Sequence, residues 1–515
     1  MDKIEIINAI YHEYFLNDLV ASESFDFTLD ADRIYVIRNI NKFDNLSKQE
    51  IIENVRNRFL SFINSDDPNV VDKQTLHITH PLYISIQRCL ILFETIKKIS
   101  DIDLKMDFEE FTTITHMIIF RVLLYNTYAM YSITNEIEHY YNSFKCIFGK
   151  EKISNWFTAE EIHSLNKNIS IAKINNYLDL FSIDISSINS VLDPFKIIKN
   201  SKSNEYTLIF LHDFTYNLYQ MLEDIILSKF NKNDQKISEY GNIRGTMFEK
   251  YIVLLLNDSI SKKNIYTNYY YRDIDGNDSE LDVLVEFDNL LLNIECKSSR
   301  FDPMLANNPG VLDDRFIKAY KRSYESIDRF QRTIEGKQII TLRKEGSKKL
   351  LDIRNKKVVS VHATAYDMRY ISTEIQRNII TSLPKYKYFP ININCIDLQC
   401  MLLEIRFGGK GDKNFQKYLM NRFEMINSQK NLKFDVDEID VYGYFIDENE
   451  SNIKTLNILK EYANIDIQID LMISNGIYRE KINKELSEMF FENRIIDFTE
   501  ETISDYIIRI FTKNN

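Results

Sequence analysis

Residues 279–300, SELDVLVEFDNLLLNIECKSSR, constrain the fold of this chain more tightly than any other segment. Two apolar-rich runs, Leu281–Phe287 and Leu290–Ile294, are separated by Asp288–Asn289, a pair typical of tight turns. The pattern predicts two paired strands that turn at Asp288–Asn289. Because most side chains in both runs are apolar, we expect the strands to belong to a buried sheet.

Charged residues interrupt this apolar hairpin at defined places. Side chains alternate between the two faces of a strand, so Glu295 and Lys297 should share one face and Cys296 should point to the other. Asp282, on the neighbouring strand, should bring its carboxylate close to that of Glu295. Two carboxylates and one amine in such a place are costly unless a cation joins them. The arrangement is typical of a magnesium-dependent phosphodiesterase site.

The pattern D-x12-E-x-K, preceded by an apolar run, resembles the motif of the PD-(D/E)xK nuclease superfamily. That superfamily includes restriction endonucleases and many effector nucleases of prokaryotic defence systems. The resemblance covers roughly residues 238–367 and implies a restriction-endonuclease-like mixed sheet flanked by helices. No proline precedes the acid here, since the local sequence is Glu280-Leu281-Asp282. Glu280 is an alternative ligand, but Asp282 lies deeper in the apolar run and is preferred.

A helix before the hairpin often supplies another acid in this superfamily, and residues Arg244–Asn257 fit that place. Their apolar side chains recur at helical spacing, with Glu249 beside the stripe. The stripe consists of Phe248, Ile252, Leu255 and Leu256. Gly245 would suit a close approach of helix and sheet. Glu249 is therefore a candidate catalytic acid, although a surface glutamate on an amphipathic helix is also common.

The resemblance implies specific roles for these residues. Asp282, Glu295 and the carbonyl oxygen of Cys296 would hold Mg²⁺, with Mn²⁺ as an alternative, because hard cations prefer oxygen ligands. Lys297 would orient the attacking water or offset negative charge as it develops. A second metal ion could bind through Glu249. The Cys296 side chain would serve packing.

Basic residues gather after the motif although the chain is acidic overall, with a net charge of −12. The segment from Arg315 to Lys357 contains fourteen Lys and Arg residues and five Asp and Glu residues, a local charge of +9. The rest of the chain must then carry −21 (−12 minus +9). This asymmetry confines attraction for a polyanion to one region. A solvated helix face is the alternative interpretation. In the superfamily the helix that follows the E-x-K strand lines the active cleft. The candidate substrate-binding residues on this helix are Lys321, Arg322, Tyr324 and Gln331.

The rest of the chain predicts a multidomain protein that combines α and α/β parts. Only one of the twelve glycines, Gly149, precedes residue 240, so residues 1–233 are expected to form an α-helical domain. Its longest predicted helices are Asp107–Phe148 and Asp213–Phe230. This domain would sense a signal, bind a protein partner or oligomerise. Residues 234–447 are expected to form the nuclease-like domain, and residues 448–515 an acidic, helical C-terminal part.

Three segments complete the predicted nuclease-like domain. Lys356–Asp367 is expected to be a strand, Pro390–Ile405 a strand followed by a helix, and Asn414–Ile426 a helix. A second E-x-K, Glu335-Gly336-Lys337, has no apolar strand before it and contains a glycine. We expect that copy to be a solvated turn.

Other chemistries find little support in the sequence. His77 and His80 have no third metal ligand nearby, and the five cysteines include no C-x2-C pair. A zinc ribbon and a disulfide framework are therefore not indicated, and the cysteine usage suits a reducing cytoplasm. The best apolar run is broken by Arg121, and Met1–Leu16 carries charges throughout. We expect a soluble, cytoplasmic protein that does not enter a membrane.

The expected function is that of a metal-dependent nuclease, with DNA favoured over RNA because most of the superfamily cuts DNA. A large helical part joined to a compact nuclease suggests, by analogy, a gated effector of antiviral defence or restriction. One alternative is a catalytically silent, nuclease-like subunit that binds nucleic acid or recruits a partner. Another, compatible with the first, is an assembly subunit that oligomerises through its C-terminal helices.

Overall fold

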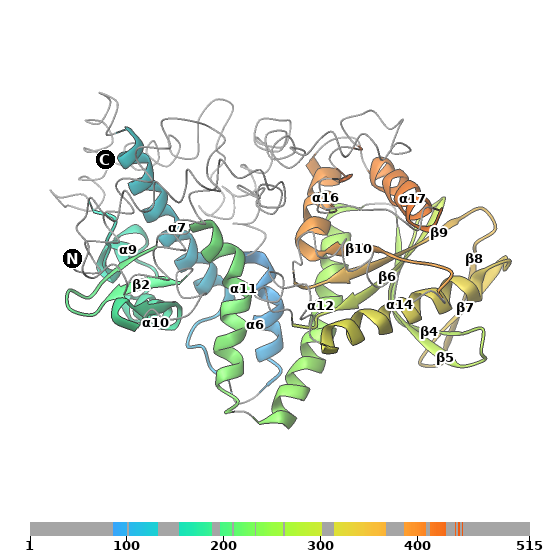
Figure 1. Cartoon of the computed structure of the whole chain (residues 1–515), viewed down its shortest axis with the longest axis horizontal. Coiled ribbons are helices and arrows are strands. Elements are labelled where there is room, and N and C mark those ends of the chain that lie inside the picture. Colours follow the sequence, from blue (N-terminus) through green and yellow to red (C-terminus); the bar gives the residue numbers. More distant parts are fainter. Residues whose placement is uncertain are drawn as a thin grey trace, which may run out of the picture. The chain divides into compact units, whose positions relative to one another are not determined.

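The structure is a computed structural model. It describes residues 86–99, 102–131, 154–187, 196–208, 211–231, 233–260, 263–300, 314–366, 386–407 and 412–428, together with Glu438, Val441, Tyr442 and Phe445. The described residues form two compact units, which are treated separately here (Figure 1). The first extends to residue 231 apart from Lys97–Ile99. The second contains Lys97–Ile99 and the residues from Asn233 onward.

The first unit is mainly helical. Its helices are α6 (Leu90–Ile96), α7 (Phe108–Tyr131), α9 (Ala159–Leu165), α10 (Ile171–Phe181) and α11 (Leu211–Ser228), with a 3-10 turn at Ile185–Ser187. Aromatic rings join three of these helices. Phe111 of α7 packs against Tyr177 and Phe181 of α10, and Phe181 meets Phe214 of α11 edge to face. These rings are buried and form the core of the unit.

This unit also contains a small sheet, which the expectation of an α-helical domain did not include. Its strands are β1 (Ser182–Asp184), β2 (Ile197–Asn200) and β3 (Glu205–Thr207). β1 runs parallel to β2, and β2 runs antiparallel to β3. Strands of three or four residues are too short to show a period of two in the sequence, so the scarcity of glycine and proline was misleading.

The predicted helices of this unit are found where the structure describes them. α11 matches Asp213–Phe230 closely, and α7 matches Asp107–Phe148 as far as Tyr131. Residues 132–153 lie outside the described residues. α7 begins with a reciprocal cap, since the Glu110 amide donates to Asp107 Oδ1 at 2.9 Å and the Asp107 amide donates to Glu110 Oε2 at 3.1 Å.

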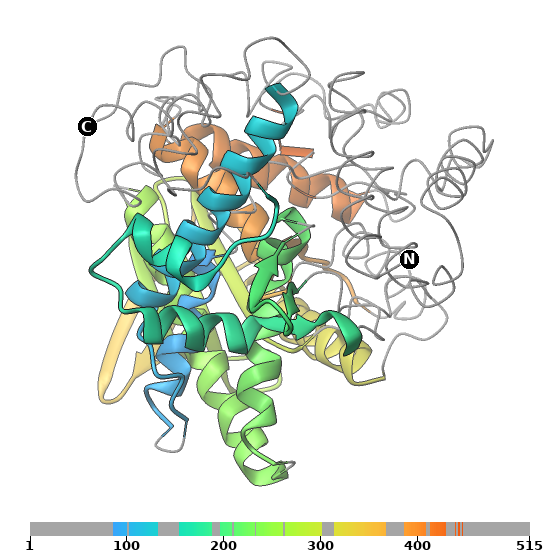
Figure 2. The same ribbon diagram turned by 90° about the vertical axis from the view of Figure 1, so that its left-hand side faces the viewer.

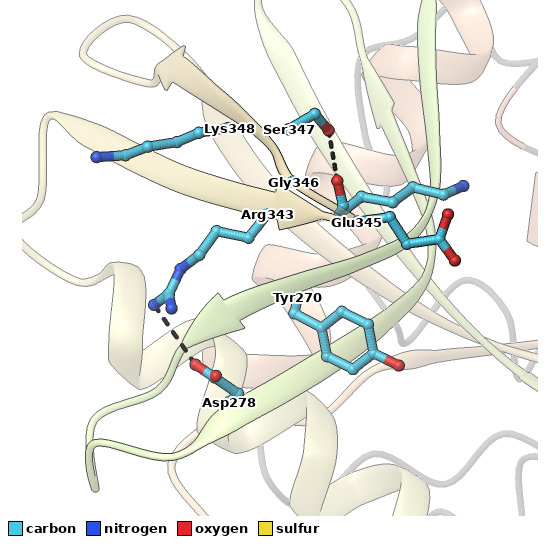
Figure 3. Close-up of a pocket in the computed structure, with 8 residues that line it drawn as sticks. Tyr270, Asp278, Arg343, Glu345, Gly346, Ser347 and Lys348 are labelled. Atoms are coloured by element: carbon cyan, nitrogen blue, oxygen red, sulfur yellow. Dashed lines mark hydrogen bonds and ion pairs between the residues drawn. The ribbon is translucent and has the colours of Figure 1, made fainter.

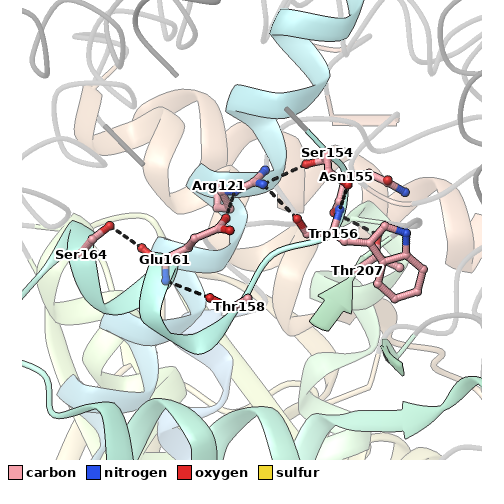
Figure 4. Close-up of polar contacts among 8 residues, drawn as sticks. All are labelled: Arg121, Ser154, Asn155, Trp156, Thr158, Glu161, Ser164 and Thr207. Carbon is pink, nitrogen blue, oxygen red and sulfur yellow. Dashed lines mark hydrogen bonds and ion pairs between the residues drawn. The ribbon is translucent and has the colours of Figure 1, made fainter. Parts of the chain in front are cut away.

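A buried ion pair links α7 to α9 (Figure 4). Arg121 Nε donates to Glu161 Oε2 at 3.0 Å, and the same guanidinium donates to the carbonyl oxygens of Ser154 and Trp156. Both charged side chains are almost inaccessible to solvent. Thr158 caps α9 by accepting a hydrogen bond from the Glu161 amide. Glu161 therefore takes part in the cap through its backbone and in the ion pair through its side chain. Arg121, which broke the best apolar run in the sequence, therefore fixes the packing of the unit.

The second unit is built on a mixed sheet of seven described strands, in the order β10-β9-β6-β5-β4-β7-β8. The strands are β4 (Asn264–Arg272), β5 (Asp278–Glu286), β6 (Leu290–Lys297), β7 (Ile339–Lys344), β8 (Ser347–Asp352), β9 (Lys357–Thr364) and β10 (Ile391–Asn394). β9 runs parallel to both β6 and β10, and the remaining pairs are antiparallel. The predicted mixed sheet in the central part of the chain is thus confirmed.

Helices cover this sheet (Figure 1). They are α12 (Asp234–Ser259), α14 (Asp314–Ile334), α16 (Cys395–Phe407) and α17 (Lys413–Ser428). α14 lies along β6 and β9, where Gln331 donates to Ser360 Oγ at 2.8 Å. α12 packs beside α16, where the Tyr251 hydroxyl donates to Gln399 at 2.8 Å. α17 lies along β9 and β10.

The predicted hairpin is confirmed in position and turn. The Phe287 amide donates to the Leu290 carbonyl oxygen at 2.8 Å, which closes the turn at Asp288–Asn289. β6 is buried along its whole length except at Lys297. It lies inside the sheet between β5 and β9, and α12 and α14 both pack against it, which explains its nearly continuous apolar sequence.

The other predictions for this unit met different outcomes. The strand within Lys356–Asp367, the strand and helix of Pro390–Ile405 and the helix Asn414–Ile426 are found as β9, β10 with α16, and α17. The second E-x-K is an exposed turn after α14, as expected. The hairpin of β7 and β8 was not predicted, because its basic residues concealed the strands. Its turn has positive φ at Glu345 and Gly346, as a type I′ turn requires.

Several predictions concern segments outside the described residues. These are the acidic C-terminal part 448–515, the N-terminal Met1–Leu16, and His77 with His80. Within the described part, Cys89, Cys296 and Cys395 are buried and carry free thiols. None of the described helices combines the length and apolar character that a membrane span requires.

Candidate active site

The centre of the sheet brings Glu295 and Lys297 together on β6. Lys297 Nζ donates to Glu295 Oε1 at 2.8 Å, so the two side chains share one face, as strand alternation predicted. Ser326 of α14 donates to the other carboxylate oxygen, Glu295 Oε2, at 3.1 Å. Glu295 is only 8% exposed. Its carboxylate is therefore held at both oxygens inside the protein.

Asp282 lies on β5 where strand pairing is interrupted on both sides. The ladder between β5 and β6 ends at Val283 and Ile294, one residue short of Asp282. The ladder between β4 and β5 skips the pair of Asn268 and Asp282, and Asn268 has a φ of 54°. The Cys296 amide instead donates to Asp282 Oδ2 at 2.8 Å. Local breaks of this kind re-aim side chains and occur often beside active sites.

The charges of these residues are coupled. Burial raises the pKa of Asp282, and the Lys297 ammonium and the Cys296 amide oppose that rise. Burial also raises the pKa of Glu295, and the negative charge of Asp282 adds to the rise. Burial lowers the pKa of Lys297, but the two carboxylates outweigh burial and leave it raised. Lys297 therefore stays charged at neutral pH between two acids of weakened acidity.

Glu249 of α12 belongs to the same electrostatic group. Burial, followed by the charges of Asp282 and Glu280, raises the pKa of Glu249 to about 7. The predicted stripe on α12 is buried, with Glu249 half-buried beside it. Glu280 is exposed, whereas Asp282 is half-buried.

Gly245 of α12 lies near Ser298, but its position does not require a glycine. A Cβ at this position would come no nearer than 3.8 Å to the closest neighbour, Ser298 Oγ, an ordinary van der Waals contact. Helix α12 therefore does not approach the sheet closely enough to require a glycine there.

The substrate-binding candidates of α14 separate into two groups. Tyr324 is fully buried, and its hydroxyl accepts from Asn392 Nδ2 at 2.8 Å. Gln331 is buried and bonded to Ser360 of β9. Side chains packed in this way are closed to a substrate, so we leave both out of the proposed site. Lys321 and Arg322 are exposed and remain predictions.

Two residues near the site were missed from the sequence. Ser326, which bonds Glu295, carries no sequence signal beyond its place on a predicted helix. His362 of β9 is the register neighbour of Glu295, and its Nδ1 lies 3.1 Å from Asn392 Oδ1. Burial lowers the pKa of His362 to about 3, so its ring is neutral. The sequence predicted the strand that carries His362 but not its pairing with β6.

The donor set can be compared with the needs of a hard cation. Asp282 and Glu295 supply carboxylate oxygens, the ligands that Mg²⁺ prefers. With both acids ionised, Lys297 leaves this group one negative charge in excess, and such an excess inside a protein favours a bound cation. Among the residues that the structure describes, no three His, Cys, Asp or Glu side chains converge as metal ligands. The fit therefore rests on the two carboxylates and the Cys296 main chain.

Comparisons of this chain with known proteins identified no relative. No family model matches the chain, and neither the curated proteins nor the solved structures include a match. The functional argument therefore rests on the chemistry of the site.

Proposed function

We propose that this protein is a magnesium-dependent nuclease that hydrolyses phosphodiester bonds, with DNA as the favoured substrate. The observation that carries the proposal is the coupling of Asp282, Glu295 and Lys297 around the Cys296 peptide. Buried acids with raised pKa values beside a charged lysine are more common at catalytic sites than in ordinary sheet cores. The D-x12-E-x-K motif joins these residues in the order expected of the PD-(D/E)xK superfamily.

Each residue has a role that follows from its contacts. Asp282, Glu295 and the Cys296 carbonyl oxygen would hold Mg²⁺ or Mn²⁺, which when bound supplies a water of lowered pKa and neutralises phosphate charge. The Cys296 amide fixes Asp282, and Ser326 fixes Glu295. Lys297, charged at neutral pH, orients the water and stabilises negative charge on the phosphate. Glu249, with a pKa of about 7, is suited to accept a proton near neutral pH.

The biological setting is proposed by analogy with the superfamily. A nuclease-like unit preceded by a second unit suits a cytoplasmic effector of antiviral defence or restriction, in which the first unit senses a signal or binds a partner. Free, buried cysteines are compatible with a reducing compartment.

One observation favours a second candidate, a catalytically silent nucleic-acid-binding or partner-recruiting subunit. Lys297 is ion-paired with Glu295, and three ligating side chains do not converge in the described part of the chain. In such a subunit the ion pair would be purely structural. Calorimetry with Mg²⁺ separates the candidates, because a silent subunit should take up no ion at Asp282, whereas a gated nuclease should.

The direct test is cleavage of plasmid DNA and of labelled RNA by wild type and Asp282→Ala, each with Mg²⁺, with Mn²⁺ and with EDTA. The proposal expects metal-dependent cutting by wild type that is lost in the variant. Equal cutting by both proteins would overturn the assignment of the site. Cutting of RNA alone would overturn the preference for DNA.

A further inference from the structure

A shallow pocket of about 520 Å³ lies on the sheet beside the turn of the β7–β8 hairpin (Figure 3). Tyr270 of β4 and Asp278 of β5 line one side of it. Residues 343–348, at the turn of the β7–β8 hairpin, line the other. The proposed reaction uses none of these residues.

Tyr270 presents an aromatic ring to this pocket. Its side chain is 42% exposed, whereas the next residue, Tyr271, is 1% exposed and packs edge to face on Phe330 of α14. Neighbouring side chains of a strand point to opposite faces, so Tyr270 lies on the face away from α14. An aromatic ring left open on a sheet can stack on another flat, apolar group.

Cationic side chains line the same pocket as this ring. Arg343 is the register neighbour of Tyr270 on β7, and Lys348 is exposed at the start of β8. The pocket also contains two acids, Asp278 and Glu345, against its three cations, and Arg343 lies 3.4 Å and Arg272 lies 3.7 Å from the Asp278 carboxylate. Lys344 is engaged elsewhere, since its Nζ donates to the Thr267 carbonyl oxygen. The side chains that line the pocket therefore carry a net positive charge, which suits an anion such as a phosphate.

The pocket is connected to the candidate active site through the sheet. Tyr270 is paired with Glu280 on β5, and Glu280 is two residues from Asp282 on the same strand. From standard strand spacings, the Cα atoms of Tyr270 and Asp282 are about 8 Å apart. A polynucleotide strand bound at Asp282 would therefore reach Tyr270 within a few nucleotides.

We propose that this pocket binds an unpaired nucleotide of the substrate, with its base stacked on Tyr270 and its flanking phosphates near Arg343 and Lys348. This inference rests on the proposed function, because it takes the polynucleotide to be the substrate cut at Asp282. The base must be unpaired, since the bases of a duplex are already stacked on one another and expose only their edges. The protein accordingly prefers single strands, or duplexes with unpaired ends, to fully paired DNA.

The test measures binding without cleavage. Fluorescence anisotropy with the full-length chain in EDTA compares a labelled single-stranded DNA oligonucleotide with the same sequence as a blunt duplex. Wild type should bind the single strand more tightly. Tyr270→Ala should weaken single-strand binding by about tenfold, the loss expected when one base–aromatic stack is removed. Tyr270→Phe should bind like wild type, because stacking does not need the hydroxyl.

A matched control lies on the same hairpin. Leu350 of β8 is 61% exposed but does not line the pocket, so Leu350→Ala should bind like wild type. Lys348→Glu should weaken single-strand binding and reduce its salt dependence, because one phosphate contact is lost.

Two results would overturn the inference. One is single-strand binding by Tyr270→Ala equal to that of wild type, and the other is a wild type that binds duplex as tightly as single strand. Neither result would contradict the proposed cleavage reaction, which is tested separately by comparing cleavage by wild type and by Asp282→Ala. Conversely, if the protein cut no substrate but Tyr270→Ala still weakened single-strand binding, the binding pocket would stand and the proposed nuclease activity would not.

Discussion

The Cys296 amide donates a 2.8 Å hydrogen bond to Asp282 across two strands whose regular pairing ends one residue earlier. This bond replaces a ladder hydrogen bond with a side-chain contact, so the carboxylate is fixed by the backbone of the strand that carries Glu295 and Lys297. The acid of the motif is thereby positioned by the peptide at the centre of its E-x-K.

Asp282→Asn should separate stability from activity. Asparagine keeps an oxygen that can accept from the Cys296 amide but removes a charge that burial disfavours. We therefore expect the free energy of unfolding in metal-free buffer at pH 7 to rise by about 1 kcal/mol. Cleavage should fall at least about a hundredfold. Urea denaturation and plasmid cleavage measure the two effects, and a destabilised variant would argue that Asp282 is structural.

Lys297→Ala should abolish cleavage without unfolding the protein. The ammonium is the positive charge beside two acids, and loss of a comparable electrostatic group costs about a hundredfold or more in rate. Lys337→Ala is the matched control, because Lys337 occupies the same E-x-K spacing in an exposed turn. The control should cut like wild type. A purified Lys297→Ala protein that cuts as fast as wild type would remove Lys297 from the proposed site.

Glu249→Gln should remove a pH-dependent cost of folding. The pKa of Glu249 is about 7 in the folded protein and 4.5 as an unperturbed group, so the folded state is favoured below pH 4.5 and loses that advantage as the pH rises through 7. Because Glu249 is only half-buried, we expect the loss to amount to about 1–2 kcal/mol. Denaturation curves at pH 5 and pH 8 should show the variant gaining on wild type only at pH 8. An equal difference at both values would contradict the shifted pKa.

Magnesium should stabilise the wild-type fold. An ion that binds only the folded state adds about 2.7 kcal/mol when its concentration is a hundredfold above Kd. Thermal unfolding should therefore give wild type a higher Tm in Mg²⁺ than in EDTA. The Tm of Asp282→Asn should be the same in both buffers. Equal shifts in both proteins would place the ion elsewhere.

Tyr324→Phe should affect stability and not catalysis. The Tyr324 hydroxyl accepts from Asn392 in the core, and its removal leaves that amide without this bond. The expected cost is about 1–2 kcal/mol in the free energy of unfolding. Cleavage per folded molecule should be unchanged. A lowered rate in a fully folded variant would return Tyr324 to the substrate-binding residues.

The sequence by itself determined the local parts of the second unit. Alternation along β6 places Glu295 and Lys297 on one face, and helical spacing buries the stripe of α12 beside Glu249, because both periods are properties of the backbone. The Asp288–Asn289 turn sets the hairpin for the same reason. The same periodicity explains why Tyr324 is not open to a substrate. The apolar stripe that marks one face of a helix also buries the residues on that face.

Only the tertiary structure decided which distant segments meet. Ser326 reaches Glu295 and His362 lies beside it because α14 and β9 pack against β6, and no local period encodes that order. The break at Asn268 that positions Asp282, and the β7–β8 hairpin that creates the Tyr270 pocket, likewise depend on pairing with β4. Strand order is set by the burial of whole faces, so it becomes visible only when the complete sheet has formed.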